Sequence, residues 1–67
     1  MLSSHLLYLL IDPAKFHILK FILEGYDNLA MISSVNARQG VIRLRYTTEM
    51  TGELFALLRA IAPSIKP

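Results

Sequence analysis

The stretch from Asp12 to Ala30 constrains the fold most, because it contains both ends of an amphipathic helix and the first residues of a strand. Asp12 can accept a hydrogen bond from a first-turn amide, and Pro13 suits the first helical position, where its missing N–H costs nothing. Gly25 is suited to a left-handed residue at the helix stop. The apolar face of this helix consists of Phe16, Ile18, Leu19, Ile22 and Leu23, with His17, Lys20 and Glu24 opposite. We therefore expect a helix that packs by one face.

Three runs of strand length surround this helix in the sequence, at His5–Ile11, Leu29–Val35 and Val41–Thr47. The first run is apolar on both faces, so we expect it to be covered on both sides. The third run alternates between apolar and basic residues, which is the clearest strand signal in the chain.

A hairpin loop of residues 36–40, with Val35 opposite Val41, would join the last two strands. This pairing turns Ala30, Ile32, Ser34, Ile42, Leu44 and Tyr46 toward the helices, and Met31, Ser33, Val35, Arg43 and Arg45 outward. A loop one residue shorter would exchange the faces of one strand, because side chains alternate along a strand.

A second helix follows the third strand. Thr48 is placed to cap it, Glu49 suits its first turn, and Pro63 is expected to stop it. Because Gly52 weakens the first turn, a start at Thr51 is the alternative. Its apolar face consists of Met50, Leu54, Leu57, Leu58 and Ile61. The element order βαββα predicts an α+β domain: a ferredoxin-like arrangement that lacks the fourth strand, with a three-stranded antiparallel sheet and two helices on one face. We expect one domain over residues 1–67, with short tails at 1–4 and 64–67.

The size and composition of the chain indicate self-association. Sixty-seven residues give only a marginal core, yet 54% of them are hydrophobic and only 18% are charged. The chain has no cysteine, which excludes disulfides, thiolate metal sites and cysteine nucleophiles. We therefore expect a homodimer.

No segment has the pattern of a signal peptide or a membrane span. The apolar run Leu6–Ile11 is short and follows no basic residue, and Ile18–Leu23 is interrupted by Lys20. We expect a cytoplasmic protein that does not enter a membrane. The formal net charge of +2 allows an acidic partner without requiring one.

Residues 19–30 (LKFILEGYDNLA) and 37–41 (ARQGV) resemble a domain of unknown function found in short bacterial proteins with a ferredoxin-like plan. The likeness extends from about Asp12 to Leu44, and it implies no activity. Asn28 stands where a glycine is expected, and both residues tolerate the left-handed region. More distantly, the arrangement is similar to ACT-type regulatory domains, which bind small effectors at subunit interfaces. The chain lacks the glycine that those domains often carry at the first strand-to-helix turn.

Five apolar side chains have no place in the predicted core and are candidate interface residues. They are Leu6, Tyr8 and Leu10 on the outer face of the first strand, Phe21 on the polar side of the first helix, and Met31 on the outer face of the second strand.

Two polar groups are candidate contacts for a ligand or an anion. Glu24, Tyr26 and Asp27 cluster at the helix stop, where they form either a small polar or acid–base site or an ordinary solvated corner. Arg43 and Arg45 either bind phosphate or carboxylate, or keep the outer sheet face in water.

Nothing in the sequence indicates catalysis, a metal or a cofactor. His5 and His17 lack the spacing of a helical ligand pair, and no glycine-rich phosphate loop occurs. Acylphosphatases carry an arginine-bearing phosphate loop after their first strand, where this chain has residues 11–13 (IDP). We therefore expect a protein without enzymatic activity.

Two functions remain open after these exclusions. One is a small interaction or regulatory module that acts as a homodimer, with or without a small ligand of unknown identity at its interface. The other is a nucleic-acid binder that uses Tyr8, Arg43 and Arg45 on the outer sheet face. The first is favoured, because the third strand presents no outward aromatic residue on which a base could stack.

Overall fold

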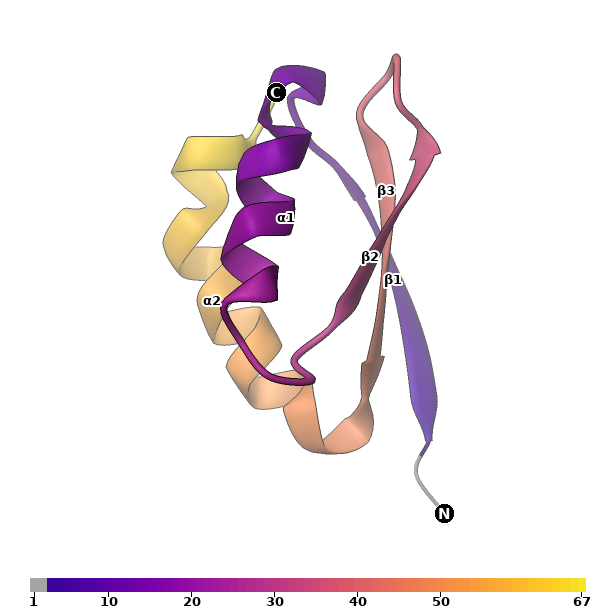
Figure 1. Cartoon of the computed structure of the whole chain (residues 1–67), viewed down its shortest axis with the longest axis vertical. Helices are drawn as coiled ribbons and strands as arrows, with labels where there is room; N and C mark the ends of the chain where they lie inside the picture. Colours follow the sequence, from indigo (N-terminus) through magenta and orange to yellow (C-terminus); the bar gives the residue numbers. More distant parts are fainter. Residues whose placement is uncertain (1–2) are drawn as a thin grey trace.

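The computed structural model describes residues 3–67, in which two helices lie on one side of a three-stranded sheet (Figure 1). The strands are β1 (Ser4–Leu10), β2 (Met31–Asn36) and β3 (Val41–Thr47), and the helices are α1 (Phe16–Glu24) and α2 (Thr51–Ile65). A short 3₁₀ turn precedes each helix, at Pro13–Lys15 and Thr48–Met50. The order βαββα and the α+β class are those predicted from the sequence.

The sheet has the strand order β1-β3-β2, and both pairings are antiparallel. β1 pairs with β3 without irregularity, from Ser4 opposite Thr47 to Leu10 opposite Val41. The second edge of β1 has no neighbouring strand among residues 3–67. This is the position that the fourth strand occupies in a complete ferredoxin-like sheet.

The hairpin between β2 and β3 differs from the predicted pairing. Asn36, rather than Val35, lies opposite Val41, so the connection is one residue shorter than expected. A β-bulge between Ser34 and Asn36 places Val35 as the additional residue of β2. The bulge compensates for the shorter loop, and Ile32 and Ser34 therefore keep the predicted face, opposite Leu44 and Ile42.

Gly40 closes this hairpin in a conformation that favours glycine. Its φ is 78°, its N–H donates to the Asn36 carbonyl oxygen at 2.9 Å, and its own carbonyl accepts from the Ile11 N–H at 2.8 Å. A Cβ atom at this position would collide with the Ile11 carbonyl oxygen. The hairpin is therefore held tightly against the end of β1.

The start of the first helix is as predicted, but its stop is not. The Asp12 carboxylate accepts from the Ala14 N–H at 3.0 Å, and Pro13 opens the 3₁₀ turn. Gly25 has φ −78°, so the expectation of a left-handed Gly25 is wrong. Its N–H and that of Tyr26 donate back to Ile22 and Leu23, which extends the turn beyond α1. The left-handed residue is Asn28, with φ 55°, three positions later.

The second helix begins at Thr51, the alternative start, and its predicted end at Pro63 is corrected. Thr48 does not cap it, because the Thr48 N–H donates to the Ser3 carbonyl oxygen and its hydroxyl bonds with the His5 imidazole. Pro63 lies inside α2 rather than ending it. Ile65 belongs to the helix and is buried, with 5% of its surface exposed, so residues 64 and 65 are not a tail.

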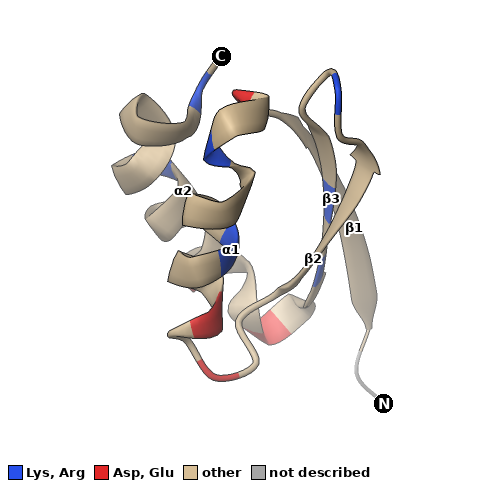
Figure 2. Ribbon diagram, turned by 45° about the horizontal axis from the view of Figure 1, so that its top comes forward, with Lys and Arg blue, Asp and Glu red and all other residues tan. Residues whose placement is uncertain are grey.

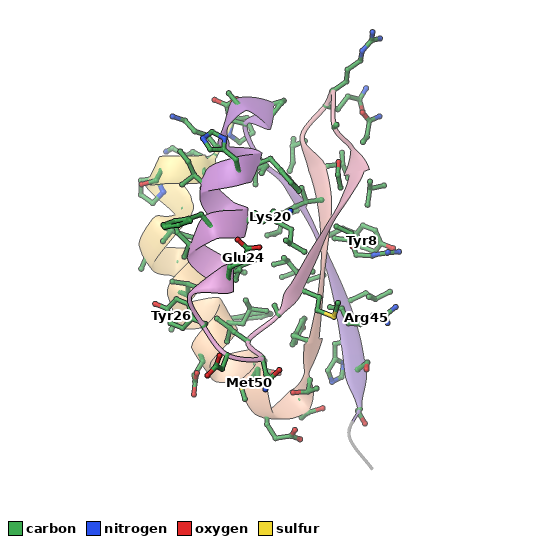
Figure 3. All side chains as sticks on the ribbon, in the orientation of Figure 1. Tyr8, Lys20, Glu24, Tyr26, Arg45 and Met50 are labelled. Atoms are coloured by element: carbon green, nitrogen blue, oxygen red, sulfur yellow. The ribbon has the colours of Figure 1, made fainter. Side chains whose placement is uncertain are left out.

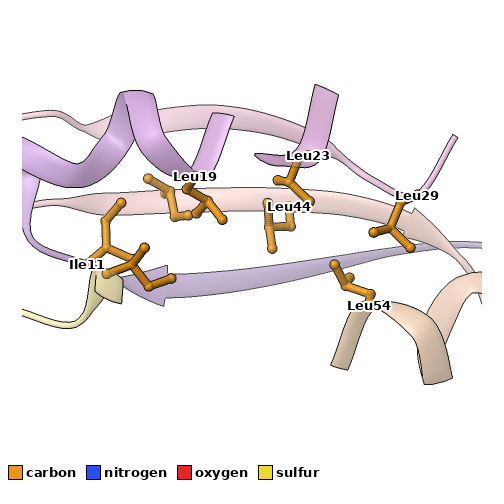
Figure 4. Packing of buried hydrophobic residues seen from close by; sticks show 8 residues of the cluster. Ile11, Leu19, Leu23, Leu29, Leu44 and Leu54 are labelled. Atoms are coloured by element: carbon orange, nitrogen blue, oxygen red, sulfur yellow. The ribbon is translucent and has the colours of Figure 1, made fainter. Parts of the chain in front are cut away.

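The core lies between the sheet and the two helices (Figure 4). Leu19 of α1, Leu44 of β3 and Leu54 of α2 are completely buried. The remaining buried apolar residues are Ile11, Leu23, Leu29, Ile42 and Ile65. The apolar face predicted for α2 faces this core, with Leu57, Leu58 and Ile61 packed at its rim. Of the face predicted for α1, Phe16, Leu19 and Leu23 contact the core, whereas Ile18 and Ile22 are only partly buried and are not part of it.

Candidate interface at the free edge of the sheet

The outer face of β1 presents three large apolar side chains away from the helices. Leu6, Tyr8 and Leu10 are exposed by 47%, 55% and 59%. They alternate with Leu7 and Leu9, which pack at the rim of the core. Figure 3 shows Tyr8 projecting from the side of the sheet opposite to the helices. The sequence therefore identified the outer face of this strand correctly.

The backbone N–H and C=O groups of successive β1 residues point alternately toward β3 and toward the free edge. The N–H of Ile11 donates to Gly40, and the carbonyl of Ser3 accepts from Thr48, so both residues turn a backbone group toward the β3 side. Both bonds extend the β1–β3 register, and residues in an antiparallel ladder alternate between hydrogen-bonded and non-bonded pairs. The backbone groups that face the free edge therefore belong to Ser4, Leu6, Tyr8 and Leu10.

This free edge lacks the features that normally protect an edge strand. Natural edges carry lysine, proline or a bulge, which discourage pairing with another chain. β1 contains no Lys, Arg or Pro (SHLLYLL) and has no bulge. The bulge of this sheet lies in β2, at the opposite edge. We conclude that β1 is the edge suited to accept another strand.

A groove lies beside β1 on the helix side. One cavity of about 320 Å³ is lined by Leu7, Phe55, Leu58 and Arg59. A second cavity of about 250 Å³ shares Leu58 and Arg59 and is otherwise lined by Leu9, Leu10, Ile11, Ala62, Ile65 and Lys66. The two shallow, mostly apolar hollows adjoin each other at Leu58 and Arg59 of α2, and we call them together the α2 groove.

The two candidate anion-binding arginines lie on β3, in the middle of the outer face. Arg43 is half-buried between Tyr8 and Ser33, and Arg45 lies exposed between Leu6 and Met31. Figure 2 shows charged residues on β3 and none on β1 or β2. The outer face thus has a basic centre, with the apolar face of β1 on one side and Met31 and Ser33 of β2 on the other.

The five predicted interface residues do not form one surface. Leu6, Tyr8, Leu10 and Met31 share the outer face of the sheet. Phe21, exposed by 77%, lies on α1 in the helix layer, where it borders His17, Ile18, Lys20 and Glu24. Phe21 therefore belongs to a different side of the molecule.

The polar corner at the end of α1 lies open to solvent. Glu24, Tyr26 and Asp27 are all exposed. The side chains of Glu24 and Tyr26 leave the chain in different directions (Figure 3). A general acid–base site needs groups that converge on a common point. The role of this corner as a ligand or anion contact stays a prediction.

The two histidines lie in different environments. His5 lies 2.8 Å from the Thr48 hydroxyl, and its ring is 5.5 Å from that of Tyr46, which is in turn 6.1 Å from Phe55. His17 is exposed on α1. Among residues 3–67, no group of three or more His, Asp or Glu side chains is arranged to hold a metal ion.

The α2 groove was not foreseen from the sequence. Phe55 and Arg59 fall outside the apolar stripe of α2, and their proximity to Leu7 depends on how the helix crosses the sheet. The one available signal was the large Phe55 beside the core residue Leu54.

A family model described as Domain of unknown function (DUF4911) matches residues 9–65. The chain belongs to the DUF4911 family. The match runs from the end of β1 to the end of α2 and confirms the predicted resemblance to a domain of unknown function. No curated protein and no solved structure matches the chain. The more distant similarity to ACT-type regulatory domains stays a prediction.

Neither helix in the described part of this DUF4911 chain has the length and apolar character needed to cross a membrane.

Proposed function

We propose that this DUF4911 protein is a small, non-enzymatic interaction or regulatory module that acts as a homodimer through the free edge of β1. The free edge of β1, which no strand within residues 3–67 covers, is the observation that carries the proposal. An exposed strand with no protective charge or bulge is a template for pairing with another strand. A second copy supplies the same uncharged strand, and a two-fold axis is the commonest closed symmetry of oligomers.

Association also addresses the small size of the domain. A fully buried leucine contributes about 1.5–3 kcal/mol, before the entropy cost of association is subtracted. Leu6 and Leu10 are each about half exposed in the single chain, so further burial remains available to them. The cytoplasmic location and a bacterial source belong to this proposal as expectations.

A small ligand would find its place in the α2 groove, because this concavity is apolar and borders the proposed interface. Arg59 and Lys66 would add cationic groups for an acidic ligand. A thermal-shift screen of small carboxylic acids, compared between wild type and Arg59→Ala, would measure this binding.

Sedimentation velocity tests the dimer directly. We expect the wild type to sediment as a dimer at about 10 µM, with dissociation on dilution. Tyr8→Pro should give a folded monomer, because the Tyr8 N–H faces the free edge rather than β3, so that proline removes a bond to the second copy only. Lys20→Glu on α1 should leave the dimer unchanged.

A compact wild-type monomer at this concentration would contradict the proposal. A Tyr8→Pro variant that is folded and still dimeric would show that the interface lies elsewhere.

Nucleic-acid binding is the second candidate function, and the juxtaposition of Tyr8 and Arg43 favours it. These residues lie opposite each other on neighbouring strands, so one base could stack on the ring while its phosphate meets the guanidinium. Titration of labelled single-stranded RNA and DNA should then show an affinity that falls steeply with salt and is weakened by Arg43→Ala. No binding at tens of micromolar in low salt would remove this function.

A further inference from the structure

We infer that two copies pair antiparallel along β1 with Leu7 on the two-fold axis, which joins their sheets into one continuous sheet of twice the width. This inference rests on the proposed homodimer and specifies its geometry. It follows from the alternating direction of the β1 backbone groups and from the length of the strand.

The alternation of backbone groups along β1 excludes half of all registers between the two copies. Only Ser4, Leu6, Tyr8 and Leu10 direct their N–H and C=O groups at the free edge. A hydrogen-bonded pair across the axis must therefore join two of these residues. A register that places Leu6 opposite Leu7 of the second copy would pair edge-facing groups with groups already directed at β3, so it forms no ladder.

Strand length selects among the remaining registers. With Leu7 on the axis, Ser4 lies opposite Leu10 of the second copy, and Leu6 lies opposite Tyr8. All four edge-facing residues then find a partner. An axis at Tyr8 would leave Ser4 opposite Asp12, which lies beyond the strand and before Pro13. An axis at Leu6 would leave Leu10 without a partner in β1.

The side chains are compatible with the Leu7 register. On the outer face, Leu6 and Tyr8 of the two copies become cross-strand neighbours, and no charged side chain of β1 is brought to the axis. On the helix side, Leu7 borders the α2 groove, so the two grooves approach each other there. Phe55 and Leu58 of both copies would lie nearest the axis. Arg59 can cover this apolar surface with its aliphatic stem while its guanidinium stays in water.

Cysteine cross-linking tests the register, and the natural chain has no cysteine to interfere. Leu7 would form a non-hydrogen-bonded pair with its own copy, at a Cα separation of about 4.5 Å, which a disulfide spans. We expect Leu7→Cys to form a covalent dimer under mild oxidation at least about ten times faster than Leu6→Cys or Tyr8→Cys alone. Met31→Cys, on the opposite edge of the sheet, is the control for random collisions.

A second measurement does not require a change at the half-buried Leu7. A mixture of Leu6→Cys and Tyr8→Cys proteins should yield the mixed disulfide in preference to either homodimer, since these two residues lie opposite each other in this register alone. Both side chains are exposed in the single chain, so neither substitution removes a core residue.

The outcomes separate the register from the dimer itself. A dimer by sedimentation that cross-links fastest through Tyr8→Cys or Leu6→Cys alone would overturn the Leu7 register and keep the proposed function. A dimer in which no β1 cysteine cross-links faster than Met31→Cys would overturn pairing through β1. A wild-type monomer would overturn both the register and the proposed homodimer.

Discussion

Gly40 is the residue whose backbone is most constrained by its neighbours. Its φ of 78° disfavours any side chain, and a Cβ there would meet the backbone of Ile11, which cannot move aside without disturbing β1. We expect Gly40→Ala to lower the free energy of unfolding by about 2 kcal/mol or more, measured by urea denaturation. Gly52→Ala is the matched control, because a Cβ on Gly52 meets no atom within 4 Å. It should stabilise α2 by up to about 1 kcal/mol. Equal effects of the two substitutions would contradict this account.

Single residues also show what the sequence can and cannot determine. Asp12 and Pro13 specify the first helix start through local chemistry, and the structure has both in their expected roles. Asn28 adopts the left-handed conformation, which asparagine tolerates better than most residues. The prediction of a left-handed Gly25 is wrong because glycine permits that region without requiring it. The N–H groups of Gly25 and Tyr26 instead donate back to α1 and continue its last turn.

At the scale of elements, the last turn of α2 contributes to the core although it follows a proline. Ile65 is 5% exposed, and its carbonyl oxygen accepts from the Asp12 N–H at 2.8 Å. We expect Ile65→Ala to lower the free energy of unfolding by about 2 kcal/mol or more, as buried truncations do. Ser64→Ala, at an exposed position of the same turn, should change it by less than about 0.5 kcal/mol. Equal melting temperatures of the two variants would show that the last turn of α2 is frayed and does not contribute to stability.

Features of the elements that depend on neighbouring residues in the sequence were predictable, whereas features that depend on tertiary contacts were not. Alternation gave the inner and outer faces of β3, and Ile42 and Leu44 are buried as expected. The bulge at Val35 could not be read from the hairpin sequence, because it depends on how Asn36 pairs with Val41. Pro63 failed as a helix stop because the contacts of Ile65 outweigh one missing hydrogen bond. The exposed Leu6, Tyr8 and Leu10 were found from alternation, whereas the α2 groove needed the three-dimensional packing.

At the scale of the whole molecule, the proposed dimer links stability to concentration. If β1 pairs between copies, dissociation accompanies unfolding, and the melting temperature must rise with protein concentration. We expect a rise of several degrees over a hundredfold concentration range for the wild type, measured by differential scanning calorimetry, and little change for Tyr8→Pro. Added salt should not lower the melting temperature, since β1 contributes no ion pair to the contact. A melting temperature independent of concentration would contradict the dimer.

The junction between β1 and α1 has a consequence for cooperativity. Two consecutive amides, those of Ile11 and Asp12, donate to Gly40 in the hairpin and to Ile65 at the end of α2. Fraying of the last turn of α2 alone would release the Asp12 amide but not the Ile11 amide. The Ile11 amide should therefore exchange with deuterium only when the domain opens as a whole, which makes it an internal reporter of the global unfolding free energy, and faster exchange at Asp12 would report fraying of α2.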